Sequence, residues 1–207
     1  MSVLIANEIN YFRVFATFIG ATALIFISKG NAWGQILMTV FCFMYAYTSY
    51  KYKYYGEVLT YLLMSLPISF VSIFAWLKNP YKKGENVVKI SKLSLCSFIF
   101  MVLLTLVVTV VFYFVLKYFK TPNLLISTIS VSTSFLAAYM LLKRISYYAI
   151  GYALNDIVLI ILWIMACVED ISYLSVVICF AMFLINDLNG FFSWHAREKK
   201  QNEEQIS

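Results

Sequence analysis

The sequence predicts an all-α integral membrane protein, from its composition and from the pattern of its apolar residues. Hydrophobic residues make up 62% of the 207-residue chain, charged residues only 13%, and the mean hydropathy is +0.82. Soluble domains carry roughly 25% charged residues, so a soluble fold of this length would lack the charges to cover its surface. The apolar residues form long runs without period-two alternation, which favours helices over a membrane β-barrel.

Seven apolar runs have the length that a helix needs to cross the hydrocarbon core, about 20 residues. Pro67 is the only proline inside a run. The N-terminal segment lacks the basic flank and cleavage site of a signal peptide, so we expect the first run to be retained. The predicted helices are Tyr11–Ile27, Trp33–Tyr50, Val58–Leu77, Leu93–Leu116, Leu124–Leu142, Ala149–Val168 and Ile171–Trp194.

Positive charge predicts the orientation of these helices. Seven crossings place the two termini on opposite sides, and the side richer in lysine and arginine is normally cytoplasmic. The loops on the C-terminal side hold eleven of the 16 basic residues, and those on the N-terminal side hold five. We therefore expect an outside N-terminus and a cytoplasmic C-terminus. Anionic lipid headgroups account for the net charge of +6, so no nucleic-acid partner is predicted.

Residue types that carry catalysis or bind metals are scarce. Cys42, Cys96, Cys167 and Cys179 all fall in apolar runs without a CxxC pair, so we predict neither disulfides nor a metal site. The sole histidine, His195, lies at the edge of the last run. No phosphate loop or nucleophile motif is present. The sequence thus predicts a protein that is not an enzyme and needs no cofactor.

A shift of 118 positions superposes the third run on the seventh, with Trp76 on Trp194. The same shift pairs Ile27 with Ile145 and Tyr45 with Trp163. We infer two three-helix repeats joined by one connecting helix, which gives both repeats the same orientation, a parallel repeat. The predicted divisions are a first repeat with its basic loop (1–92), a connecting helix (93–122), a second repeat (123–194) and a cytoplasmic tail (195–207).

Only two of the ten acidic residues lie inside predicted helices. Asp156 and Asp187 each follow an asparagine, Asn155 and Asn186 respectively. A carboxylate at the centre of a membrane helix costs roughly 2.5–3.5 kcal/mol on insertion scales, so it normally faces protein or a water-filled cavity. Two interpretations stay open at this point. The four side chains either join helices to one another or line a polar cavity.

The seventh run places a polar, a small and an aromatic residue on one helical face, at Asp187, Gly190 and Trp194. The matching face of the third run reads Ser69, Ser72 and Trp76. An indole can stack on a flat ring or attract a cation.

Both tryptophans also precede basic segments, where anchors at the membrane interface are expected. Stacking and anchoring therefore remain alternatives for Trp76 and Trp194. Tyr45 and Trp163 lie deeper in their runs and are further stacking candidates, and Trp33, which opens the second run, is expected to be an anchor.

Three segments resemble the PnuC family of vitamin and nucleoside transporters. The third run, KYYGEVLTYLLMSLPISFVSIFAW followed by LKNP, is similar to that family's YGE…P…W segment. The segment YALNDIVLIILW resembles its second-repeat span with an asparagine and a tryptophan, and FLINDLNGFFSW resembles its N…G…W ending. The likeness covers essentially the whole chain.

This resemblance implies a three-plus-one-plus-three helix fold like that of the sugar-exporting SWEET proteins, in the cell membrane of a bacterium. It also implies uptake of nicotinamide riboside by facilitated diffusion, with cytosolic phosphorylation trapping the imported molecule. Relatives that carry thiamine, riboflavin or deoxynucleosides make those ring-bearing molecules the alternative substrates. A non-transporting membrane scaffold is the alternative of another class, and a homo-oligomer is compatible with the sequence.

The resemblance also implies which residues bind the substrate. By position the site uses Asn155, Asn186, Trp76 and Trp194, with Tyr45 and Trp163 nearby. Asp156 or Asp187 would pair with a cationic ring or couple protons, and these two roles stay open. The chain departs from the family at Ser69, where a glutamine is common, and at Ser72, where a glycine is.

Overall fold

The protein is described here by a computed structural model, which covers residues 11–51, 55–82, 84–169, 171 and 174–206. Helices α3, η2 and α4 follow one another without a break, so the described helices form seven rods, as predicted. The elements are α1 (Tyr11–Ser28), α2 (Trp33–Lys51), α3 (Tyr55–Thr60), the π-helical turn η2 (Tyr61–Ser65), α4 (Leu66–Leu77), α5 (Leu95–Tyr118), α6 (Leu124–Leu142), α7 (Tyr148–Glu169) and α8 (Leu174–Ile206).

Four stretches within the described helices are long and apolar enough to cross a membrane. These are Val58–Leu77, Leu95–Tyr118, Leu124–Leu142 and Tyr148–Val168. The apolar segments Phe18–Ser28 of α1 and Trp33–Tyr47 of α2 are shorter. Large apolar side chains such as Phe18 on α1 and Leu106 on α5 point outward and are more than half exposed, as lipid-facing residues would be.

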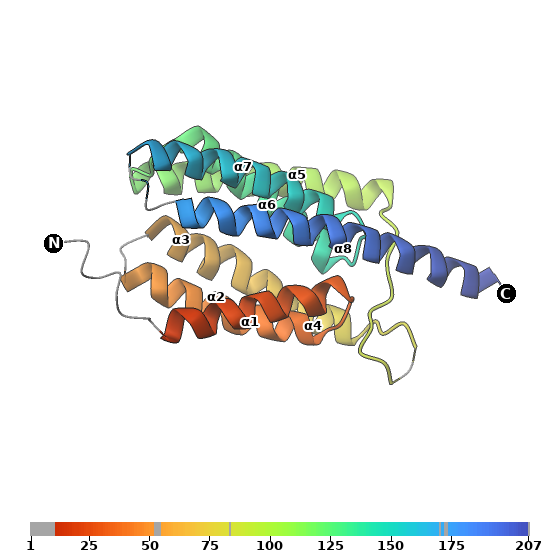
Figure 1. Cartoon of the computed structure of the whole chain (residues 1–207). Coiled ribbons are helices and arrows are strands. Elements are labelled where there is room, and N and C mark those ends of the chain that lie inside the picture. Colours follow the sequence, from red (N-terminus) through yellow and green to blue (C-terminus); the bar gives the residue numbers. More distant parts are fainter. Residues whose placement is uncertain (1–10, 52–54, 83, 170, 172–173, 207) are drawn as a thin grey trace.

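Several helix ends differ from the sequence prediction, and two of these differences are informative. Helix α5 begins at Leu95 instead of Leu93, because the Ser94 hydroxyl accepts a hydrogen bond from the Ser97 amide (3.2 Å) and caps the helix. Helix α8 does not end at Trp194 but continues to Ile206, so the predicted tail is helical over most of its length. Figure 1 shows this extension projecting beyond the other helices at the C-terminal end.

The third rod contains a π-helical turn directly before Pro67. The Leu66 amide donates to the Tyr61 carbonyl, five residues back. A proline inside a helix has no amide hydrogen to donate, and its ring crowds the carbonyl four residues earlier. The widened turn gives that ring room, and such turns occur frequently at functional sites.

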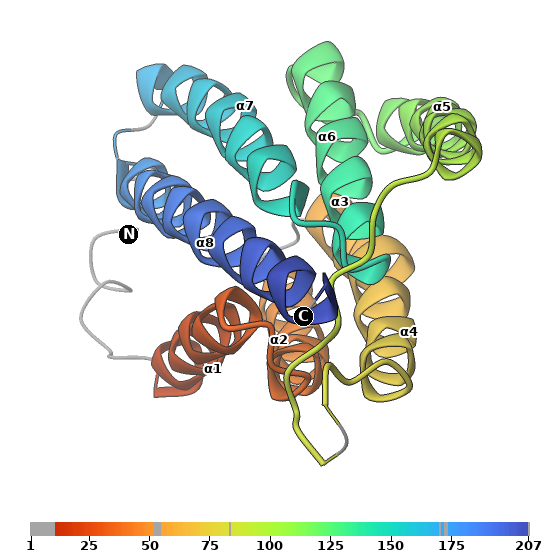
Figure 2. The ribbon, with the colours of Figure 1, turned by 90° about the vertical axis from the view of Figure 1, so that its right-hand side faces the viewer.

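Six of the rods form a closed ring, with α5 outside it. Neighbouring contacts run from α1 to α2, on to α3–α4, then to α6, α7 and α8, and α8 packs back against α1. Figure 2 shows this order viewed along the bundle, with α5 outside the ring beside α6. The contacts of α4 with α6 and of α8 with α1 therefore close the ring at two places.

The basic loop after α4 crosses the ring at one end. The Val88 amide donates to the Gly30 carbonyl (2.9 Å), just past α1, and the Ser91 amide donates to the Arg144 carbonyl (3.0 Å), just past α6. Gly30 and Arg144 both have positive φ, of 67° and 60°. One loop thus ties together the ends of two helices that lie on different sides of the ring.

The extension of α8 fastens this loop. The side chain of Gln201, 4% exposed, accepts from the Ile90 amide (2.9 Å) and donates to the Val88 carbonyl (3.2 Å). The Tyr81 hydroxyl donates to Glu204 (2.6 Å), and the Ser146 hydroxyl donates to Glu198 (2.6 Å). These contacts supply the physical reason for the helical conformation of 195–206, which hydropathy alone could not predict.

We call α1, α2 and α3–α4 the first triplet and α6, α7 and α8 the second. The single shift of 118 positions is wrong for the first helices of these triplets, α1 and α6. Helix α1 ends at Ser28 and α6 at Leu142, 114 positions apart. The shift would place Ile27, inside α1, on Ile145, which lies in the loop beyond α6. Gly30 and Arg144, with equivalent backbone geometry, are also 114 positions apart. The second triplet therefore has four more residues than the first between its first and third helices (118 − 114 = 4). An ungapped comparison cannot detect such an insertion.

Candidate functional site

Trp76 and Trp194 form a fully buried pair at the end of the ring that the basic loop after α4 crosses, which we call the basic end. Their ring centroids lie 5.6 Å apart, and their exposed fractions are 1% and 0%. The Trp76 indole N–H on α4 donates to the Leu141 carbonyl in the last turn of α6 (3.2 Å). The Trp194 indole N–H on α8 donates to the Ile27 carbonyl in the last turn of α1 (2.9 Å). Each tryptophan therefore joins its own triplet to the first helix of the other.

This geometry excludes one of the two roles left open for these tryptophans, that of anchors at the membrane interface. An interfacial anchor exposes its ring to lipid headgroups, whereas both rings here are sealed inside the bundle. Trp33, at the start of α2, is 53% exposed and does have the exposure of an anchor.

A polar layer lies two helical turns deeper than the tryptophans. Asp187 and Ser69 each precede a tryptophan by seven residues, about 10 Å along a helix. The carboxyl groups of Asp156 on α7 and Asp187 on α8 lie close to each other, and the Asn186 side chain hydrogen-bonds to Asp187. The structure thus brings together the two carboxyl groups that the sequence singled out.

The opposite side of the ring contributes to the same layer. The Cys42 thiol on α2 hydrogen-bonds with the Ser69 hydroxyl on α4. Cys42, Asp156 and Asp187 all lie close enough to interact electrostatically with the Tyr152 hydroxyl on α7. Because α2 and α7 are not neighbours in the ring order, this proximity places the layer on the inner side of the ring.

Asn155 has a different environment from Asp156. It is 6% exposed, and its Oδ1 accepts from the Thr133 hydroxyl (2.9 Å) and the Ser130 hydroxyl (3.4 Å), both on α6. In this conformation its carbonyl oxygen thus joins α7 to α6. Ser72 is buried too, and its hydroxyl donates to the Ile68 carbonyl of its own helix (2.7 Å).

Tyr45 belongs to an aromatic group beyond the polar layer. Its ring lies 4.3 Å from that of Tyr61 in the π-helical turn and 5.6 Å from that of Phe41. Trp163 follows Asp156 by seven residues on α7, which places both on one face, and its indole nitrogen is buried. The two stacking candidates thus lie on α2 and α7, the helices whose side chains approach each other in the polar layer.

Sequence reasoning missed three inward-facing side chains. Tyr148 packs edge-on against Trp194 (4.7 Å between centroids), and its hydroxyl lies beside Gly190, at ordinary van der Waals distance (3.4 Å) from where a Cβ would stand. Tyr152 lies one turn further along α7. Gln35, 1% exposed, has no hydrogen-bond partner for its Nε2 among the described residues. The spacing of Tyr148, Tyr152 and Asp156 at i, i+4, i+8 was the available signal.

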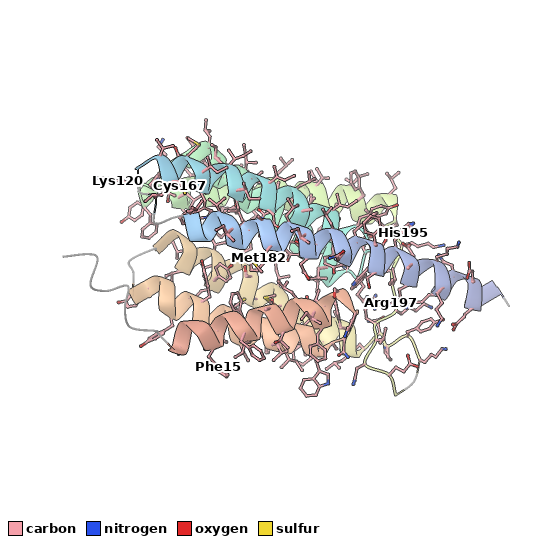
Figure 3. All side chains as sticks on the ribbon, in the orientation of Figure 1. Phe15, Lys120, Cys167, Met182, His195 and Arg197 are labelled. Atoms are coloured by element: carbon pink, nitrogen blue, oxygen red, sulfur yellow. The ribbon has the colours of Figure 1, made fainter. Side chains whose placement is uncertain are left out.

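The titratable groups at the basic end are outside the membrane-length segments. Burial lowers the pKa of Arg197, whose guanidinium donates to the Ser28 carbonyl (3.4 Å). His195 is exposed, stacks on Phe191 and lies 3.8 Å from Glu198. Figure 3 shows His195 and Arg197 at this end and Lys120 and Cys167 at the other. Among the described residues, no group of histidine, cysteine or acidic side chains is arranged to hold a metal.

Comparison with known proteins identifies the family. The family model described as "Nicotinamide mononucleotide transporter" matches residues 10–196. This chain belongs to that family. Its fold, with the buried tryptophan pair and the polar layer inside the ring, is therefore that of a transporter family, and the predicted membership of a family of vitamin and nucleoside transporters is confirmed.

Individual relatives agree with this membership. The chain is 25% identical over 97% of its length to a protein of Neisseria mucosa named nicotinamide riboside transporter PnuC, covering 78% of that protein. It is 24% identical over 88% of its length to the protein of the same name from Haemophilus influenzae, again covering 78% of it. The crystal structure of the vitamin B3 transporter PnuC is similar in fold, with a TM-score of 0.77, 23% identity, and coverage of 96% of this chain and 86% of that one.

Proposed function

We propose that this protein carries nicotinamide riboside across a bacterial cell membrane by facilitated diffusion, and that phosphorylation in the cytosol traps the imported molecule. The family membership and the names of the two bacterial relatives support the substrate class. The observation that carries the proposal is the polar layer of Ser69, Tyr152, Asp156 and Asp187 on the inner side of the ring. Polar groups inside a membrane-spanning bundle cost free energy, and they commonly mark the path of a substrate or an ion.

The proposed architecture is a three-plus-one-plus-three parallel repeat of the SWEET type, with α5 as the connector. The reciprocal indole hydrogen bonds of Trp76 and Trp194 and the matched backbone of Gly30 and Arg144 support a twofold relation between the triplets. The basic end, where the loop after α4 and the α8 extension meet, is proposed to be cytoplasmic, which leaves the N-terminus outside.

The proposed binding site lies between the tryptophan pair and the aromatic group of Tyr45. The amide of Asn186 and the hydroxyls of Ser69 and Ser72 would bond the ribose or the carboxamide. The flat ring would stack on Tyr45 or Trp163, because Trp76 and Trp194 cover each other in this conformation. Opening of the tryptophan pair would then release the substrate into the cytosol.

Uptake into liposomes tests the proposal. Purified protein should import labelled nicotinamide riboside, and an imposed pH gradient should leave the rate unchanged. Asn186→Ala should reduce uptake at least about tenfold, as the loss of a hydrogen bond in a ligand site does. Asn189→Ala is the matched control, since Asn189 is exposed on the same helix three residues away. Failure to import nicotinamide riboside, thiamine, riboflavin or deoxynucleosides would defeat the proposal.

A non-transporting scaffold is the second candidate, and the environment of Asn155 favours it. The oxygen of this amide is already bonded to Thr133 and Ser130, as expected of a contact between helices. In a scaffold, Asn155→Leu and Asn186→Leu would each lower stability by about 1–2 kcal/mol and no flux would exist to lose. In a transporter, Asn186→Leu would abolish uptake at temperatures where the protein is still folded. Thermal unfolding measured beside uptake separates the two.

A further inference from the structure

The acidic pair Asp156–Asp187 lacks a cationic partner. Asp156 is 4% exposed, and its Oδ2 has no hydrogen-bond partner among the described residues. None of the salt bridges found in the described part of the chain involves Asp156 or Asp187; they join Lys82, His195 and Lys200 to glutamates of the α8 extension. Buried charges in proteins are normally paired or bound to a metal. No cationic side chain in the described part of the chain therefore balances the negative charge that this pair would carry.

The two carboxyl groups lie close enough to act on each other electrostatically. Ionised carboxylates in contact repel each other strongly. A cation held beside them would compensate their negative charge.

The surroundings leave that charge to be matched from inside the ring. The neighbouring polar groups are the amide of Asn186 and the hydroxyls of Tyr148 and Tyr152, with Cys42 on the opposite side. All are uncharged hydrogen-bonding groups that can orient a ligand without neutralising an acid. The Tyr45 and Trp163 rings, beyond the layer, supply faces on which a flat cation can stack.

We propose that Asp156 and Asp187 act together as an acidic pair that selects a singly charged, planar organic cation over an uncharged molecule of the same shape. This inference rests on the proposed function, because the pyridinium ring of nicotinamide riboside is such a cation. Its charge would compensate the pair when bound, and the pair would discriminate against neutral rings that fit the same space.

The test compares two forms of one ligand. Nicotinamide riboside is cationic, and its reduced dihydropyridine form has nearly the same shape without the charge. Binding of each to detergent-purified full-length protein is measured by calorimetry, beside uptake of labelled nicotinamide riboside into liposomes. Wild type should bind the cation at least about tenfold more tightly than the neutral form. Equal affinities would overturn the inference by themselves, even if uptake proves the proposed function right.

Two isosteric substitutions locate the effect. Asp156→Asn and Asp187→Asn should each weaken binding of the cation about tenfold or more while changing binding of the neutral form less than about threefold. Retained binding of the neutral form also shows that the variant is folded. Glu203→Gln, at an exposed position of the α8 extension, is the matched control and should leave both affinities unchanged. A loss of the same factor for both ligands in both aspartate variants would show a structural pair and refute the proposal. Absence of uptake of any ring-bearing solute would instead refute the proposed function.

Discussion

The first three rods of the ring (α1, α2 and α3–α4, the first triplet) and the last three (α6, α7 and α8, the second triplet) make matching contacts but differ in chemistry. Each donates an indole hydrogen bond to the first helix of the other. Yet the two carboxyl groups Asp156 and Asp187 belong to the second triplet, whereas the first offers Cys42, Ser69 and Gln35, whose Nε2 has no hydrogen-bond partner among the described residues. The indole hydrogen bonds that close the ring therefore occur in both triplets, whereas the buried carboxyl groups that could act on a ligand occur in only one.

Helix α6 differs from the other membrane-length helices in how much of it is covered by protein. Helix α5 covers α6, with a hydrogen bond between Thr109 and Ser132 (2.7 Å), and 56% of the most apolar stretch of α6 is buried. Only 17% of the most apolar stretch of Val58–Leu77 and 22% of that of Tyr148–Val168 are buried. The serines and threonines of α6 are thereby shielded from lipid by protein, which explains how a helix with six such residues can lie in the bundle.

The largest expected effect tests the buried tryptophans, whose indole hydrogen bonds both triplets share. Trp76→Ala and Trp194→Ala should each destabilise the protein by about 3–5 kcal/mol, because each removes a fully buried ring and leaves a helix-end carbonyl without its donor. If the halves are equivalent at this position, the two losses should agree within about 1 kcal/mol. Thermal or denaturant unfolding in detergent measures both. Trp33→Ala, at an exposed position, is the control. If Trp76→Ala or Trp194→Ala lowers the free energy of unfolding no more than Trp33→Ala does, the two tryptophans do not have equivalent roles.

A smaller effect is expected at the matched residues with positive φ. Gly30→Ala should cost about 1–2 kcal/mol, because its φ of 67° disfavours a side chain and the new Cβ would lie 2.7 Å from Arg197 Nη1. Arg144→Gly should instead stabilise by up to about 1 kcal/mol, since it relieves the same backbone strain and the Arg144 Nε and Nη1 atoms have no partner among the described residues. Melting temperatures that move in the same direction for both variants would contradict the matched geometry.

The smallest effect concerns the α8 extension, which has no counterpart in the first triplet. Hydrogen bonds from Tyr81 and Lys82 lower the pKa of Glu204, and Glu204 raises the pKa of Tyr81 to about 12. The stabilisation that Glu204 provides is present above its ordinary pKa and is lost as the pH falls through its lowered pKa. That of Tyr81 is present below pH 10 and is lost as the pH rises through about 12.

Melting temperatures of wild type and Glu204→Gln should therefore differ slightly near neutral pH and converge in acid. The difference is expected to be small, because the groups are exposed and water screens their interaction. Glu203→Gln, the adjacent exposed position, should show no such convergence. A difference between wild type and Glu204→Gln that grows on acidification would contradict the assignment of the contact.

The sequence alone determined the membrane class, the positions of the helices and the presence of two acids inside them, because each depends on local composition or on the spacing of residues along one helix. It also carried the family resemblance. It could not determine that Trp76 and Trp194 cover each other instead of facing the interface, that Asp156 meets Asp187 while Asn155 turns to α6, or that a charged tail folds along a loop. Those outcomes depend on the rotation of each helix within the ring and on contacts between residues 22 to 123 positions apart, which only the tertiary structure decides.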